Sequence, residues 1–258
     1  MLRREIEYFF TALMFYTRIP IPAWVRYSDE RLNKSRKYFP LIGWIIGGLG
    51  AGVFGLAHYL LPLSVSVLLS MAATVYWTGA FHEDGFADTC DAFGGGWTKA
   101  QILMIMKDSR VGAFGMVGFL LLFALKFAAL YEIALKSAAL LPLVLLNGHT
   151  LSRFIASTFI QTHDYVQDLD KSKAKPIMTR RLSGGEMAFS AVFVLLAGGL
   201  LSPPAFLVAA ALAYGSKVWL GTYFQRHIGG YTGDCLGATQ QVSEVVFYLS
   251  LLALWKFI

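Results

Sequence analysis

Three aspartates lie within the longest polar interruption between the apolar segments of this chain, residues 82–115. Asp84, Asp88 and Asp91 are spaced i, i+4 and i+7, which on a helix stacks their carboxylates along one face. Carboxylates this close repel one another, and a bound divalent cation removes the repulsion; hard oxygen ligands favour Mg²⁺ or Mn²⁺. We therefore predict a metal site. The alternative is a solvated acidic helix end, which we disfavour because charges beside apolar spans are costly unless they are used.

Two cations, a carboxylate and a hydroxyl follow in the same polar stretch. They are consecutive, at Lys107, Asp108, Ser109 and Arg110. Acidic residues, glycines and nearby cations together are typical of a site for a metal-bound diphosphate. Phosphoryl transfer requires that charge on the transferred group and on the leaving phosphate is neutralised. We therefore expect Lys107 and Arg110 to act catalytically, with Asp108 and Ser109 contacting the substrate.

A second polar motif runs from Gly229 to Glu244 and forms a loop before the last predicted span. Glycines flank Asp234 there, so that backbone N–H groups could approach phosphate oxygens. We predict that Gly233, Asp234 and Gly237 contact the substrate and that Asp234 adds a fourth carboxylate to the metal site. The alternative is a glycine-rich turn in which Asp234 caps a helix.

Several single polar residues have two interpretations. His82 competes with the aspartates as proton acceptor, because its unperturbed pKa lies nearest neutrality; a packing histidine at a helix start is the alternative. Arg153 either contacts the substrate or snorkels to the membrane surface, and Arg18 is a candidate substrate contact. Three polar residues at the start of the last helix either bind a polar substrate or mark the membrane interface: Gln240, Gln241 and Glu244. Two lysines within predicted spans either snorkel to the membrane surface or form ion pairs: Lys126 and Lys217.

The composition is typical of a helical membrane protein. Of 258 residues, 56% are hydrophobic and 15% are charged, against about 25% charged in soluble domains. The net charge of +6 could indicate a nucleic-acid partner. The basic residues, however, lie in loops beside apolar segments, where membrane orientation explains them, so we expect no nucleic acid. Cys90 and Cys235 form neither a zinc nor a disulfide pattern.

Apolar windows of roughly 20 residues can span the hydrocarbon layer. We expect an all-α, polytopic membrane helix bundle of about seven transmembrane helices, forming a single catalytic domain over residues 1–258. Apolar residues between positions 6 and 14 fall on one helical stripe, which predicts an N-terminal interfacial helix, with a buried bundle helix as the alternative. The predicted spans are 38–61, 65–81, 111–133, 138–160, 187–201, 204–222 and 242–257.

The loops alternate in charge along the chain. The connections at 62–64 and 202–204 are short and uncharged, whereas residues 1–37, the segment 161–186 and both polar motifs carry most of the Lys and Arg. The positive-inside rule therefore places the N-terminus and every polar motif in the cytoplasm, on a shared membrane face. The first span also carries a stripe of small residues suited to close helix contact: Gly43, Gly47, Gly48, Gly50 and Gly52.

Linked motifs along nearly the whole chain resemble those of the cobalamin-5'-phosphate synthases, also called adenosylcobinamide-GDP ribazoletransferases. HEDGFADTCDAFGGG at 82–96 resembles the family signature HxDGxADxxDG, and IMKDSRVGAFG and GGYTGDCLGA are similar to the next two signatures. FYTRIPIP and RKYFPLIGWIIG fit the opening blocks. The departures are Glu83, where an apolar residue is common, Ala92 for a common glycine and Lys99 for a frequent arginine; none removes an aspartate.

The resemblance implies a late step of vitamin B12 assembly, at the cytoplasmic face of the bacterial inner membrane. Adenosylcobinamide-GDP and α-ribazole, or its 5'-phosphate, are joined through a phosphodiester, GMP leaves, and Mg²⁺ is required. These small molecules and membrane lipid are then the partners, and homo-oligomerisation is left open. In this chemistry the diphosphate is bridged by Mg²⁺, an aspartate takes the proton of the ribose hydroxyl, and Lys107 or Arg110 stabilises the departing GMP. The expected metal ligands are Asp84, Asp88, Asp91 and Asp234.

Two other classes of protein use acidic residues in membranes. CDP-alcohol phosphotransferases, which make phospholipid, also cluster Asp and Gly at a membrane face. Their signature has Ala-Arg after DGxx, where this chain has Ala87 and Asp88. A divalent-cation transporter would place such groups near the bilayer midplane, often between inverted repeats, and no repeat is visible here.

Overall fold

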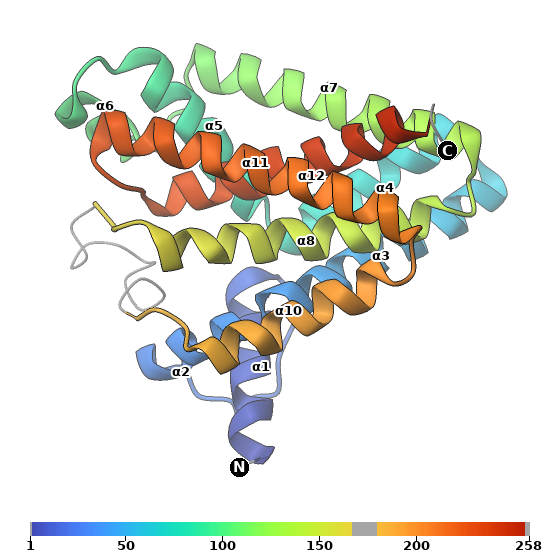
Figure 1. The fold of residues 1–258 in the computed structure, drawn as a ribbon, viewed down its shortest axis with the longest axis horizontal. Coiled ribbons are helices and arrows are strands. Elements are labelled where there is room, and N and C mark those ends of the chain that lie inside the picture. Colours follow the sequence, from blue (N-terminus) through green and yellow to red (C-terminus); the bar gives the residue numbers. More distant parts are fainter. Residues whose placement is uncertain (1, 167–179, 256–258) are drawn as a thin grey trace.

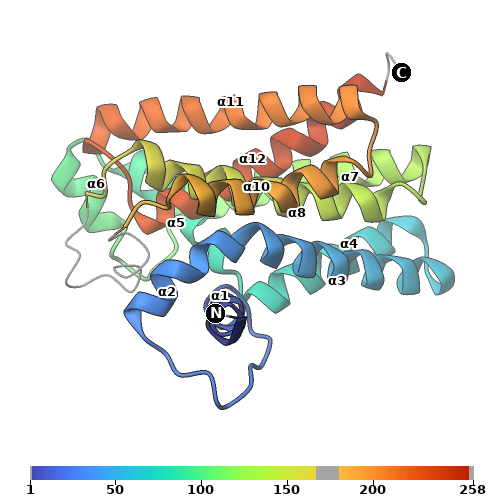
Figure 2. The ribbon, with the colours of Figure 1, turned by 60° about the horizontal axis from the view of Figure 1, so that its bottom comes forward.

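The computed structural model describes residues 2–166 and 180–255, and these fold as helices around one long bundle (Figures 1 and 2). The only β-structure in these ranges is an isolated bridge between Tyr165 and Tyr231. The all-α prediction is therefore confirmed. The elements are α1 (Leu2–Tyr16), α2 (Asp29–Ser35), the 3₁₀ turn η1 (Arg36–Tyr38), α3 (Phe39–Leu60), α4 (Leu63–Thr78), α5 (Phe81–Gly95), α6 (Lys99–Ile105), α7 (Ala113–Lys136), α8 (Leu141–Thr162), α10 (Gly184–Gly198), α11 (Pro203–Ile228) and α12 (Gly233–Leu254).

Each of the seven predicted spans coincides with a helix, but fewer helices are long and apolar enough to cross a membrane. Among the described residues, the continuous segment Asp29–Leu60, α7 and α11 meet that condition, and α4 with α5 makes a fourth if the bent pair is one span. Helix α10 is apolar but shorter. The chain is thus a multi-pass membrane protein by length and composition, and the count of seven is not established.

The second motif is helical, which corrects the prediction that it forms a loop. Helix α12 begins at Gly233, nine residues before the predicted start of the last span. The side chain of Thr232 accepts a hydrogen bond from the N–H of Cys235 and caps the helix. Asp234 therefore lies in the first turn, where the helix dipole favours a negative charge, and is not the N-cap.

A sharp bend separates α4 from α5. The two helices differ in direction by 90°, because Gly79 and Ala80 adopt left-handed backbone conformations with φ of 68° and 58°. Glycine tolerates this conformation, whereas an alanine there is strained. The backbone N–H of Arg18 donates to the carbonyl of Trp77 at 2.7 Å and ties the N-terminal segment to the bend. The predicted helix 65–81 therefore ends at Thr78, and α5 leaves in a new direction.

Glycines let α3 approach its neighbours closely, as predicted for the first span. A Cβ atom at Gly43 would lie 2.5 Å from the carbonyl oxygen of His149, and one at Gly47 would lie 2.8 Å from Cα of Leu146. At Gly50 it would lie 2.7 Å from Cγ2 of Thr74 on α4. The other two glycines of the stripe, Gly48 and Gly52, face open space. Close packing therefore explains three of the five.

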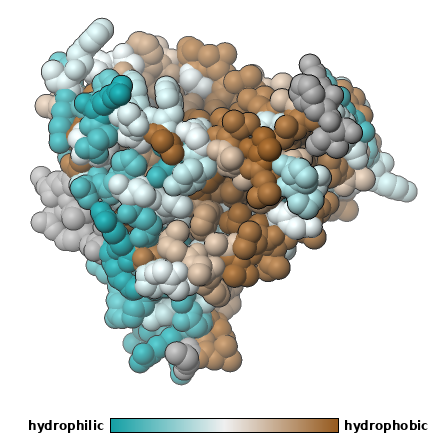
Figure 3. Space-filling model, in the orientation of Figure 1, coloured by the Kyte–Doolittle hydropathy of each residue, from teal (hydrophilic) through white to brown (hydrophobic). Residues whose placement is uncertain are grey.

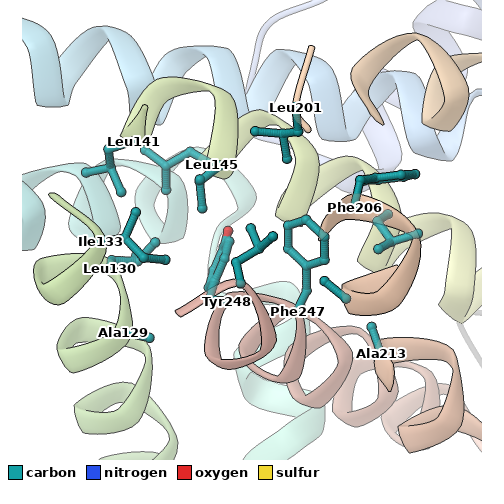
Figure 4. Close-up of a cluster of buried hydrophobic side chains, with 14 of the residues drawn as sticks. Ala129, Leu130, Ile133, Leu141, Leu145, Leu201, Phe206, Ala213, Phe247 and Tyr248 are labelled. Atoms are coloured by element: carbon teal, nitrogen blue, oxygen red, sulfur yellow. The ribbon is translucent and has the colours of Figure 1, made fainter. Parts of the chain in front are cut away.

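An apolar core fills the end of the bundle away from the polar motifs (Figure 4). Phe247 and Tyr248 of α12 are completely buried there, between Leu130 and Ile133 of α7 and Phe206 of α11. This packing fixes the C-terminal half of α12. The N-terminal half of the same helix is then held at the opposite end of the bundle, against α5.

Helix α1 runs across the direction of the bundle helices, and Figure 2 shows it nearly end-on. Its charged side docks on the chain that leads into α3: Lys37 pairs with Glu5 at 2.7 Å and Arg31 with Glu7 at 3.1 Å. Leu2 and Ile6 remain exposed. Figure 3 shows hydrophilic residues gathered along the end with α2 and the α5–α6 connection, and hydrophobic residues over the centre and opposite end. The interfacial position of α1 stays a prediction.

Candidate active site

The site is organised by a close crossing of α5 and α12. A Cβ atom at Gly85 would lie 3.1 Å from Cα of Asp234, and one at Gly237 would lie 3.0 Å from the carbonyl oxygen of His82. The two backbones therefore meet at a pair of glycines, which larger residues would push apart. This contact brings Asp234 to the helix that carries the three other aspartates.

The carboxylates of four aspartates lie close enough to interact electrostatically. We call them the acidic cluster: Asp84, Asp88, Asp91 and Asp234. Asp88 is half-buried and interacts electrostatically with the other three carboxylates. Burial, and secondly the nearby carboxylate of Asp84, raise the pKa of Asp234 to about 6. Asp84 itself is exposed. Like charges gathered in this way favour the binding of a cation.

Asp91 is engaged differently from the rest of the cluster. Its two carboxylate oxygens accept hydrogen bonds from the backbone N–H groups of Gly112 at 2.7 Å and Gly115 at 2.8 Å. A side chain at either glycine would collide with this carboxylate. Asp91 thus ties α5 to the N-terminus of α7, where unpaired N–H groups and the helix dipole favour an anion. Each oxygen keeps a second lone pair that can accept another partner.

The donor set suits a hard divalent cation, because all four candidate ligands are carboxylates. As the side chains stand, the described part of the chain has no group of three or more His, Cys, Asp or Glu side chains placed to hold a metal ion. The chemistry of the donors and their mutual repulsion are therefore the features that support a metal.

The cations predicted for catalysis lie on the connection between α6 and α7. Arg110 pairs with Asp108, its own neighbour, through Nη2 at 2.6 Å and Nε at 2.9 Å. These hydrogen bonds lower the pKa of Asp108 to about 2. Lys107, Ser109 and Arg110 are exposed. The structure therefore places this group in an exposed turn, where Arg110 contacts Asp108 rather than an aspartate of α5.

The remaining predicted residues are divided between the rim and the interior. Arg18 is exposed, and its guanidinium lies against Gly79 at the bend that precedes α5. His82 is buried, with its ring stacked on Phe39 at 5.7 Å and its Nε2 without a partner. Arg153 is also buried, and its Nη1 contacts Nδ1 of His149 at 3.1 Å. Burial excludes the snorkelling interpretation of Arg153.

A set of buried polar side chains adjoins the acidic cluster, and the sequence predicts it only in part. Lys126 Nζ of α7 lies 2.6 Å from Oε1 of Glu244 of α12, and both side chains are buried. A charged residue inside an apolar span indicates a partner, but the sequence does not identify it. The structure also pairs Lys217 with Thr162, at 2.7 Å. Both lysines are thus paired and do not snorkel.

Comparisons with known proteins show which sequences this chain is similar to. The sequence profile of the cobalamin-5-phosphate synthase family matches residues 8–252. Proteins named adenosylcobinamide-GDP ribazoletransferase are similar over almost their full length. The one from Shewanella frigidimarina is 46% identical, covering 97% of this chain and 95% of the relative. The one from Shewanella amazonensis is 46% identical, covering 98% of each.

No solved structure matches this chain. The assignment therefore depends on sequence similarity that extends over both polar motifs and the helices that bring them together. On that similarity, the chain belongs to the cobalamin-5-phosphate synthase family.

Proposed function

We propose that this chain joins adenosylcobinamide-GDP to α-ribazole, or to its 5'-phosphate, with release of GMP. The family and the names of the relatives support this transfer as a step of cobalamin synthesis. The observation that carries the proposal is the crossing of α5 and α12 at Gly85 and Gly237, which brings Asp234 to the aspartates of α5. Two motifs separated by more than a hundred residues thereby form one acidic site.

In the proposed reaction, a ribose hydroxyl oxygen attacks the phosphorus nearer the cobinamide. The bond from that phosphorus to the bridging oxygen breaks, and the electron pair leaves with GMP. The hydroxyl proton passes to a carboxylate of the acidic cluster, or to His82 if the site opens to it. Asp84, Asp88 and Asp234 would hold Mg²⁺, with Asp91 bracing α5 from the side of α7. When bound, Mg²⁺ neutralises the diphosphate.

The other predicted residues have supporting parts. Lys107 and Arg110 lie in an exposed turn, and Arg110 would exchange Asp108 for the departing phosphate as negative charge develops there. Ser109 and the backbone near Gly233 and Gly237 would contact substrate oxygens. Arg18 would contact the substrate from the exposed rim of the site, and Arg153 would contact it from the buried side.

We further propose that the site faces the cytoplasm at the inner membrane. The α5–α6 connection and the N-terminal ends of α10 and α12 lie at one end of the bundle (Figure 1). Lys99, Lys107 and Arg110 belong to that end, as the positive-inside rule requires. Lys171, Lys173 and Lys175 of the basic segment 161–186 lie outside the described residues. The exposed apolar side chains of α7 and α11 support contact with lipid.

The test is turnover by the purified protein in lipid nanodiscs with adenosylcobinamide-GDP, α-ribazole and Mg²⁺. We expect equal amounts of GMP and of the joined corrinoid, and loss of both products when EDTA removes the metal. Parallel reactions with a CDP-alcohol donor, and uptake of Mn²⁺ into proteoliposomes, test the two other classes. Transfer to a lipid acceptor, or uptake without GMP release, would contradict the proposal.

A further inference from the structure

A continuous chain of buried contacts connects α7, α12 and α5 below the acidic cluster. Lys126 contacts Oε1 of Glu244 at 2.6 Å, and Gln240 donates to Oε2 of Glu244 at 2.7 Å. Gln241 then donates to Oε1 of Gln240 at 2.8 Å and to Oε1 of Glu83 at 3.0 Å. We call these five residues the buried polar chain. Its last member, Glu83, directly precedes Asp84.

The buried polar chain is costly to break because none of its members reaches solvent. Glu244 and Gln240 are completely buried, and Lys126, Gln241 and Glu83 are at most 5% exposed. A buried charge or amide that loses its partner is not rescued by water. Tyr248 further fixes Glu244 by donating to Oε1 at 3.0 Å. The side chain of Gln241 is therefore held in the orientation that reaches Glu83.

The glycine contact alone does not set the rotation of α5. Gly85 and Gly237 determine how near the two backbones come, but neither has a side chain that resists turning or sliding of one helix on the other. Successive helix residues differ by about 100° in direction. Holding Glu83 therefore determines where Asp84 points, and with it Asp88 one turn later. Asp91 holds the far end of α5 through Gly112 and Gly115.

We propose that Glu83 and Gln241 are positioning residues, which orient α5 so that Asp84 and Asp88 face Asp234 as one cation site. This inference rests on the proposed function for the identity of the site but concerns residues that touch neither substrate nor metal. Partners of metal ligands commonly act in this way, and their loss costs about 10- to 100-fold in metal affinity. The alternative is a scaffold that contributes to stability alone.

The test compares Mn²⁺ binding, measured by the EPR signal of free Mn²⁺, in purified variants. Glu83→Leu and Gln241→Leu break the same bond from its two sides, while Glu83→Gln keeps an oxygen that accepts from Gln241. Lys217→Met is the matched control, because Lys217 is as buried as Gln241 and pairs with Thr162 of α8, outside the buried polar chain. Thermal unfolding and the Mg²⁺ concentration for half-maximal ribazole transfer are measured on the same samples.

We expect both leucine variants to bind Mn²⁺ about tenfold more weakly and to need correspondingly more Mg²⁺. Glu83→Gln should keep wild-type affinity, and Lys217→Met should lose thermal stability alone. Wild-type affinity in both leucine variants, or equal weakening in Glu83→Gln, would overturn the positioning role. If the variants bind Mn²⁺ as expected but the wild-type protein transfers no ribazole, the positioning role stands and the proposed function is contradicted.

Discussion

Two groups of polar side chains lie close together on α5 and α12, the second extending to Lys126 of α7, and they differ in charge balance and exposure. The acidic cluster has four carboxylates of one sign, with Asp84 exposed and Asp88 half-buried. In the buried polar chain Lys126 pairs with Glu244, and Gln241 donates a hydrogen bond to one oxygen of Glu83. Paired charges inside a bundle maintain the fold, whereas unpaired like charges at its end oppose it. The imbalance in the acidic cluster therefore indicates that a cation or substrate completes it.

Neutralising one aspartate of the acidic cluster should have the largest effect on activity and should separate the two groups most clearly. We expect Asp88→Asn to lower the rate of ribazole transfer by about 10³-fold, the upper range for loss of one electrostatic group. Its thermal stability should equal or exceed that of the wild type, because the substitution removes repulsion from Asp84 and Asp234. Rates and melting temperatures of the same preparation check both parts. A variant that is fully active but less stable than the wild type would show that the acidic cluster stabilises the fold and does not act in transfer.

Neutralising a charge of the buried polar chain should have the opposite signature. Lys126→Met removes the cation that contacts the buried Glu244 most closely, and breaking such a pair costs about 3–5 kcal/mol in comparable cases. The double variant Lys126→Met/Glu244→Gln removes both charges and should recover most of that loss. Thermal unfolding in one detergent measures both. If the single and double variants melt alike, the ion pair does not stabilise the bundle.

Arg110 tests whether the exposed turn acts on the leaving group. We expect Arg110→Gln to lower kcat by about 10²-fold while donor KM changes little, because charge on the departing phosphate develops in the transition state. Asp108→Asn is the matched control, since it releases Arg110 from its salt bridge without removing the cation. An unchanged kcat with raised KM in Arg110→Gln would assign the arginine to ground-state binding.

Enlarging a glycine where α5 and α12 cross should move the two polar motifs slightly apart, with a smaller effect on activity than loss of a charge. In Gly237→Ala the new methyl group would lie 3.0 Å from the carbonyl oxygen of His82, so α12 must shift by a few tenths of an ångström. We expect about a tenfold loss of transfer rate, since small displacements at reacting groups are costly. Gly48→Ala on α3 is the control, because nothing lies near that position. Equal activity of the two variants would show that the crossing tolerates separation.

The sequence predicts the helices well because apolar length and polar interruption are local properties. It also groups Asp84, Asp88 and Asp91 correctly on one helix, since their spacing follows the helical period. It does not reveal the 90° bend at Gly79 and Ala80, which depends on backbone conformation at two residues.

Long-range pairing was the harder part of the site. Lys126 and Glu244 are more than a hundred residues apart, and each has other charged candidates in the sequence. The role of Asp91 at the N-terminus of α7 was likewise missed, because the accepting carboxylate and the donating backbone groups lie in different segments. Glycines at 112 and 115 were the available signal, since they leave room for that carboxylate.

The central claim is that α5 and α12 together form one cation site. Crystals grown with Mn²⁺ test it directly through the anomalous scattering of the metal. We predict one strong peak between the carboxylates of α5 and Asp234, lost in crystals of Asp234→Asn. A peak that persists without the Asp234 carboxylate, or active protein whose only bound Mn²⁺ lies away from α5, would contradict the account.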